Sequence, residues 1–165
     1  MDTMIRLRLL IAGYPGLTQP SEITQWAVNE LATGNNESPV LELAILEPAD
    51  DPLREAESVL AHYGLAVPTA RDRDLVSVVW FADSVTRGRM SAREAAHKMY
   101  AVDPDDVDLK LLSELAELVS AFPDMPGYLT KLNADLVVCR DSAWREFELR
   151  SRKGWTAAGS IDSLS

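Results

Sequence analysis

The sequence is poor in cysteine and in long apolar runs, and each shortage excludes a class of protein. Cys139 is the only cysteine, so no internal disulfide can form, which is typical of proteins kept in a reducing compartment. No stretch approaches the ~20 apolar residues that a membrane helix needs, and the N-terminal apolar run is too short for a secretory signal. We therefore expect a cytoplasmic protein that does not associate with a membrane.

Basic residues and catalytic motifs are also scarce. The 165 residues contain 16 lysines and arginines against 26 aspartates and glutamates, which gives a formal net charge of −10. Because affinity for nucleic acid comes largely from cationic side chains that displace counterions, we do not expect a nucleic acid partner. The glycine-rich phosphate loops, the serine-hydrolase elbow and the zinc-peptidase motif do not occur in the sequence. We therefore expect no cofactor, and a non-enzymatic protein is favoured over an enzyme.

The sequence does contain a succession of helix-forming segments. Apolar residues make up 47% and charged residues 25%, values that are usual for globular proteins. Apolar side chains recur at spacings of three and four residues, and Pro, Gly, Ser or Asp stand at the ends of the segments. These patterns predict about eight short-to-medium helices in a compact all-α bundle. The expected helices cover about residues 4–12, 20–34, 38–46, 51–63, 71–87, 91–102, 103–122 and 128–150.

Two segments are also compatible with β-strands. Residues 4–12 alternate between apolar and other side chains, and residues 75–82 are rich in β-branched and aromatic residues. A lone strand at 4–12 would have no partner, and the length of the second segment favours a buried helix. Helices are the preferred interpretation, and the strand alternative stays open for both segments.

The length of the chain suits one domain, which we expect to cover residues 1–150. A glycine precedes a glutamate by six residues in two places, at Gly16 and at Gly88. The domain could therefore consist of two related four-helix halves, 1–66 and 71–150. Coincidence among helix-end residues explains the same spacing.

The last segment and the tryptophans complete the expected organisation. Residues 151–165 are small and polar, which is typical of a flexible tail. We assign Trp26, Trp80 and Trp144 to the core. Trp155 is unusual in a polar tail, and it could anchor a partner.

Residues 103–122 form the clearest predicted helix. Asp103 is in position to cap it, with Pro104 as its first residue. One apolar face is expected to enter the core, made of Leu111, Leu112, Leu115, Leu118, Val119 and Phe122. A calcium-binding loop over the same aspartates is not favoured, because Asp108 stands where such a loop needs a glycine. We expect no metal.

The two histidines and the cysteine have no partners at a catalytic or metal-binding spacing. His62 falls near a predicted helix end, where the helix dipole favours it, and His97 falls on a mostly polar face. Cys139 lies in an apolar run, which is typical of a small buried side chain. We expect structural roles for all three. A small-molecule site or an enzyme would require a pocket that holds a histidine against a carboxylate.

The uneven charge is the most useful functional signal. Residues 37–57 and 103–124 each contain seven acidic residues and one basic residue, a local balance of −6. An acidic surface steers a basic partner toward it and speeds the encounter. Solvation and helix capping explain the same charges. The candidate partner-binding residues are Asp103, Asp105, Asp106, Asp108, Glu114 and Glu117.

The second half of the chain resembles a class of small bacterial proteins. Its segments GRMSAREAAHKMYAV and LSELAELVSAFPDMP, with an acidic break between them, are similar to the helices of small acidic all-helical bacterial proteins of unknown function. Some proteins of this kind are immunity partners of bacterial toxins. The resemblance implies a class of binding protein and assigns no functional residue.

The expected function is therefore protein binding through an acidic surface, as in an immunity protein that masks a basic toxin or effector. The alternative is a small-molecule-binding helical protein, or an enzyme with an unrecognised site. A third option is a structural adaptor, whose sign would be a large exposed apolar patch rather than an acidic one.

Overall fold

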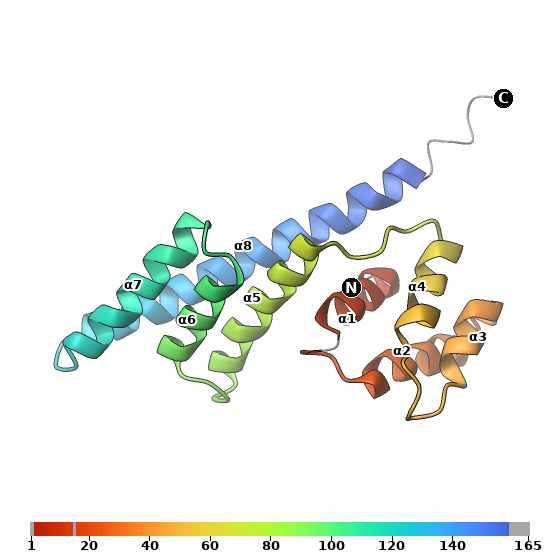
Figure 1. The fold of residues 1–165 in the computed structure, drawn as a ribbon, viewed down its shortest axis with the longest axis horizontal. Helices are drawn as coiled ribbons and strands as arrows, with labels where there is room; N and C mark the ends of the chain where they lie inside the picture. The colour runs from red at the N-terminus through yellow and green to blue at the C-terminus, as the bar shows by residue number, and fades with distance from the viewer. Residues whose placement is uncertain (1, 15, 159–165) are drawn as a thin grey trace. The chain divides into compact units, whose positions relative to one another are not determined.

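The structure is a computed structural model that describes residues 2–14 and 16–158, with side chains as far as Arg152. Its described residues contain eight helices and no strand (Figure 1). The helices are α1 (Thr3–Gly13), α2 (Pro20–Ala32), α3 (Ser38–Ala44), α4 (Leu53–His62), α5 (Ala70–Thr86), α6 (Ala92–Val102), α7 (Val107–Ala121) and α8 (Pro126–Ala158). The all-α prediction is confirmed. Both segments that were also compatible with strands are helical.

The chain forms two compact units. Unit 1 consists of Met1–Arg73 with Glu148–Ser165, and unit 2 consists of Asp74–Phe147. The helices α5 and α8 each run from one unit into the other. No helix among the described residues is long and apolar enough to cross a membrane.

Several helices begin or end at the serine and glycine residues that predicted their ends. Gly64 and Gly88 follow α4 and α5 with φ angles of 68° and 67°, a region that residues with a Cβ seldom adopt. Ser91 caps α6, because its hydroxyl accepts a hydrogen bond from the Glu94 amide at 3.1 Å. The helix α8 continues to Ala158, into the segment that was expected to be a tail, and residues 159–165 lie outside the described residues.

Helices α1 to α4 bury one apolar core in unit 1. Leu7 and Ile11 of α1 meet Ile23, Trp26 and Ala27 of α2 in a single buried cluster that also takes in α3 and α4. The indole Nε1–H of Trp26 donates to the Thr3 carbonyl oxygen at 3.0 Å, which satisfies the one polar atom of this buried ring. Each large apolar side chain buried in this way stabilises the fold by about 1.5–3 kcal/mol.

The tryptophan predictions were correct only in part. Trp26 is buried, as predicted, but Trp80 is 36% exposed and therefore does not belong to the core. Trp144 is half-buried and packs at 5.9 Å between ring centres against the buried Phe147. Trp155, the predicted partner anchor, lies beyond Arg152, the last residue whose side chain the structure describes.

A buried carboxylate, Asp72, joins three helices of unit 1. It is 1% exposed and lies in the first turn of α5. Its Oδ2 accepts from Nη2 of Arg8 in α1 at 3.1 Å, and its Oδ1 accepts from Nε of Arg150 in α8 at 2.7 Å. The Thr69 amide and hydroxyl also donate to Oδ2, at 2.8 and 2.9 Å. Thr69 and Asp72 thereby form a capping box that starts α5.

The electrostatics of this cluster are asymmetric, with two guanidinium groups for one carboxylate. Burial raises the pKa of Asp72, but hydrogen bonds from Arg150 and Thr69 and the charge of Arg8 outweigh burial and leave the pKa below its ordinary value. Burial lowers the pKa of Arg8, although the charge of Asp72 opposes this effect. Asp72 is therefore ionised in the folded protein, and it neutralises a charge that could not be buried alone.

The start of α7 differs from the prediction. Asp103 ends α6 as its C-cap, and Asp106 rather than Asp103 caps α7, by accepting from the amides of Asp108 and Leu109 at 2.9 and 3.0 Å. Pro104 disfavours helical backbone at the residue before it, so α6 and α7 are separated by a turn. The helix predicted to begin at Pro104, with Asp103 as its cap, therefore begins at Val107.

The buried face of α7 is also shifted. It consists of Leu109, Leu112, Leu115 and Ala116, packed within unit 2. Three residues expected in the core, Leu111, Leu118 and Phe122, are 57%, 39% and 48% exposed. Because Leu111 and Leu112 are adjacent, the apolar face of the sequence is broad. Its periodicity therefore does not show which part of that face is buried.

We predict that Asp72→Asn lowers the free energy of unfolding by about 3–5 kcal/mol, because it leaves the buried Arg8 without a counter-charge. The matched control is Asp83→Asn, which removes a 3.4 Å pair with Arg140 that is partly solvated. That change should cost less than about 1 kcal/mol. Urea unfolding followed by circular dichroism measures both, and equal losses would contradict the assignment.

The same variant gives a pH test. Since the folded-state pKa of Asp72 is lowered, its contribution to stability is present above the unfolded-state pKa of about 3.9 and is lost as the pH falls through the folded-state pKa. The difference in urea midpoint between the wild type and Asp72→Asn should therefore shrink from pH 7 to pH 3. A difference that stays constant would mean that the charge of Asp72 does not stabilise the fold.

Candidate functional site

The six predicted partner-binding residues divide into two groups. Asp103 and Asp106 are half-buried and serve the helix ends, as the C-cap of α6 and the N-cap of α7. The other four, Asp105, Asp108, Glu114 and Glu117, are exposed in the α6–α7 turn and on α7. We call this group of six the acidic surface. Helix capping explains the carboxylate of Asp106, whereas Asp103 caps α6 through its backbone amide, and the other four residues face solvent.

Three of the exposed carboxylates are available to a partner. Glu117 contacts His97 of α6, with 3.0 Å between Oε1 and Nε2. Asp105, Asp108 and Glu114 form no ion pair or side-chain hydrogen bond within the part of the chain that the structure describes. Lys110 is the only basic residue of α7. The acidic surface therefore keeps a negative charge that its own helix does not neutralise.

An exposed apolar stripe runs along α7, and sequence analysis had placed most of it in the core. It consists of Val107, Leu111, Leu118 and Phe122, which are 68%, 57%, 39% and 48% exposed. At 100° per residue these positions fall within about 60° of one another around the helix. Glu114 falls on the same line. We call these four apolar residues the α7 stripe.

The stripe borders a groove between α7 and α8. This cavity, of about 270 Å³, is lined by Asp108, Leu111, Leu112, Asp135, Val138, Cys139 and Ser142. Leu112 is buried, whereas Leu111 and Val138 are among the most exposed apolar side chains of unit 2. Lys131 pairs with Asp135 at 2.7 Å, so Asp108 is the carboxylate of the groove that has no ion pair among the described side chains. We call this cavity the α7–α8 groove.

Cys139 reports the electrostatics of the groove. The thiol is half-buried, and burial together with the negative charges of Asp108, Asp106 and Asp135 raises its pKa to about 11. A thiol with this pKa is almost wholly protonated near neutral pH, so Cys139 is a poor nucleophile. Its pKa reflects its burial first and the nearby carboxylates second.

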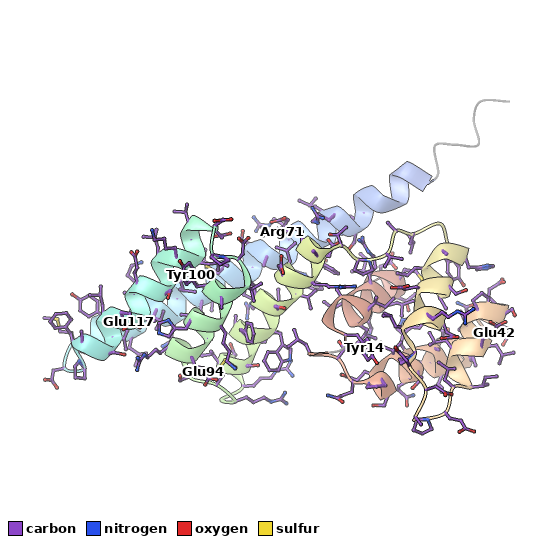
Figure 2. All side chains as sticks on the ribbon, in the orientation of Figure 1. Tyr14, Glu42, Arg71, Glu94, Tyr100 and Glu117 are labelled. Carbon is purple, nitrogen blue, oxygen red and sulfur yellow. The ribbon has the colours of Figure 1, made fainter. Side chains whose placement is uncertain are left out.

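His97 lies between a hydroxyl and a carboxylate of α7. Its Nδ1 is 3.0 Å from the Ser113 hydroxyl, and its Nε2 is 3.0 Å from Glu117. Figure 2 shows Glu117 on α7 beside α6, the helix that carries His97. The arrangement has the residue types of a hydrolytic triad, but Ser113 lies inside α7, where backbone amides are used by the helix and cannot form an oxyanion hole.

His97 also lines an open cavity of about 460 Å³ with Ser91, Arg93, Glu94, Lys98 and Ala101. All six residues come from α6 or its N-cap, so among the described residues one helix supplies the wall. Lys98 is paired with Glu94 at 3.2 Å and lies 5.9 Å from the centre of the Phe81 ring. The cavity is large enough for a small molecule.

The remaining candidates have ordinary structural contacts. His62, in the last turn of α4, lies 3.3 Å from Glu37 on an exposed surface of unit 1. Among the described residues, no group of three or more His, Cys, Asp or Glu side chains is placed to hold a metal ion.

We predict that alkylation of Cys139 by iodoacetamide rises tenfold per pH unit up to pH 10 without levelling, because the pKa of the thiol is about 11. A free thiol of pKa about 8.5 should level off in that range. Asp108→Asn should speed the reaction at pH 8, while Asp141→Asn, which removes a partner of Arg140 outside the groove, should not. A plateau near pH 9 would contradict the proposed environment.

No family model, curated protein or solved structure matches this chain. The likeness of its second half to small acidic helical bacterial proteins therefore remains an expectation from the sequence. The features that bear on its function are the acidic surface, the α7 stripe, the α7–α8 groove and the cavity beside His97.

Proposed function

We propose that the chain is a non-enzymatic protein-binding module that binds a basic protein through the acidic surface. The observation that carries the proposal is the group of three exposed carboxylates, Asp105, Asp108 and Glu114, that have no ion pair within the described residues. An immunity protein that masks a basic toxin or effector is the form of this function that the sequence favours. The solitary cysteine favours the cytoplasm as the place of the encounter.

The physical effect of such a surface is mainly kinetic. Unpaired carboxylates on one helix and the preceding turn add to the field of a chain with a net charge of −10. Such fields raise association rates with an oppositely charged protein by about 10- to 1,000-fold at low salt, and salt screens them over about 10 Å. Cationic side chains that face the surface in the complex add specificity.

We predict that the triple variant Asp105→Asn, Asp108→Asn, Glu114→Gln slows association with the partner by at least about tenfold at low ionic strength. The matched control is Glu42→Gln, Glu47→Gln, Glu57→Gln, which removes the same charge from unit 1. The partner is first captured from the source lysate at low salt and identified, and association rates are then measured at two ionic strengths. Equal rates for wild type and triple variant at low salt would overturn the proposal.

A second candidate function is the binding of a small anionic molecule at the open cavity beside His97. The observation in its favour is the cavity of about 460 Å³, whose lining includes Arg93 and Lys98 as well as the imidazole. Its weakness is that one helix supplies every lining residue in the part of the chain that the structure describes, whereas ligand pockets are usually enclosed by several elements.

Thermal unfolding in the presence of a panel of small anions, such as phosphate, citrate and nucleotides, tests this alternative. A ligand of the cavity should raise the midpoint for wild type and for Lys131→Gln but not for Lys98→Gln. Both lysines form exposed ion pairs one helical turn long, so the two substitutions are matched. A shift shared by all three proteins would reflect general ionic effects and would exclude this site.

A further inference from the structure

We propose that the α7–α8 groove and the α7 stripe together bind the apolar face of a basic amphipathic helix. This inference rests on the proposed function and deepens it, because it names the segment of the partner that is recognised. An acidic surface alone would bind many basic proteins weakly. An apolar groove inside that surface would select those that present an apolar side chain between their cations.

The groove has the features of a site for an apolar anchor. Its floor is the buried Leu112, and its walls are Leu111 on α7 and Val138 on α8. Leu111 is 57% exposed and Val138 is 66% exposed, so both would lose a large area of water contact when covered. At about 25 cal/mol per Å² of apolar area, covering two such side chains is a substantial driving force for binding. A cavity of about 270 Å³ is large enough for one leucine or phenylalanine side chain.

The stripe extends this site along one direction. Val107, Leu111, Leu118 and Phe122 span 16 positions, from the first residue of α7 to its C-cap, which is about 22 Å along the helix. A partner helix with anchors at spacings of three, four and seven residues would follow such a line, as in other complexes where a helix fills a groove. Phe122 closes the line against Tyr128, with 6.0 Å between their ring centres.

The charges around the groove select a basic occupant. Asp108 lines the groove without a counter-charge of its own, and Glu114 interrupts the α7 stripe. Asp108 and Asp135 line the groove together with Cys139, and their negative charges add to burial in raising the pKa of that thiol. Lysines or arginines flanking the anchor residues would meet these carboxylates, whereas an acidic helix would be repelled.

The same charges argue against two other occupants. A symmetric dimer built on this face would bring two copies of the same acidic patch, with Asp108 and Glu114, into one interface, where their like charges would repel. A bilayer with anionic headgroups would be repelled for the same reason. A basic amphipathic helix uses both the apolar and the acidic features, and it is therefore the occupant to which we commit.

Three synthetic helices of about 16 residues test the inference. The first carries leucine on one face and lysine elsewhere, the second replaces the lysines by glutamate, and the third replaces the leucines by serine. The leucine–lysine peptide should bind to the full chain, as measured by fluorescence anisotropy. It should also slow the alkylation of Cys139, which locates the peptide at the groove. The other two peptides should neither bind with similar affinity nor protect the thiol.

Substitutions distinguish the contribution of the groove to peptide binding from that of the acidic surface. Leu111→Ser with Val138→Ser should weaken binding of the leucine–lysine peptide on the order of tenfold. The matched control, Leu41→Ser with Ile45→Ser, changes two exposed apolar residues of unit 1 and should leave binding unchanged. All four side chains are exposed, so circular dichroism should report the same helical content for each variant.

The outcomes distinguish failure of the inference from failure of the proposed function. If Asp108→Asn with Glu114→Gln weakens binding and the groove variant does not, the acidic surface stands and the groove is excluded as the helix site. If neither change weakens binding, both proposals are overturned. If sedimentation shows a dimer that the groove variant dissociates, a second copy of the chain is the occupant and the helix inference is wrong.

Discussion

The ion cluster around Asp72 is the constraint on which unit 1 depends. A carboxylate that is 1% exposed is tolerated only because two guanidinium groups, an amide and a hydroxyl surround it. These contacts join α1, the start of α5 and the end of α8, which are far apart along the chain. The apolar cluster of α1 to α4 buries non-directional surface, and it does not specify where α5 and α8 meet α1. Charge pairing supplies that specification, because any other arrangement would leave Arg8 buried without a counter-charge.

The helices could be predicted from the sequence because each has local chemical signals at its ends. The capping of α6 by Ser91 and the glycines after α4 and α5 follow from interactions within a few residues. The Asp72 cluster could not be predicted in this way, because its partners are 64 and 78 positions away. One signal was present: Arg8 lies between Leu7 and Ile11 on the inner side of α1, where an unpaired arginine would be costly.

The candidate site was predictable in its charge and not in its shape. The excess of acidic over basic residues between positions 103 and 124 predicted where the acidic surface lies. It could not show that Asp103 and Asp106 cap helices, because the turn at Pro104 decides this. The α7 stripe was missed because α7 is apolar over more than half of its circumference, and only packing against its neighbours determines which leucines are covered. An apolar surface wider than the core requires is itself the signal of a second contact.

The division of unit 1 between two distant segments affects how the chain folds during synthesis. Arg8, Thr69 and Asp72 leave the ribosome early, but Arg150 follows only after residues 74–147 have been made. At 5–20 residues per second this interval is roughly 4–15 s, which is long compared with the formation of helices and local contacts. During that time Arg8 and Thr69 are the available partners of Asp72. Unit 1, whose synthesis begins first, is therefore the last to complete its ion pairs.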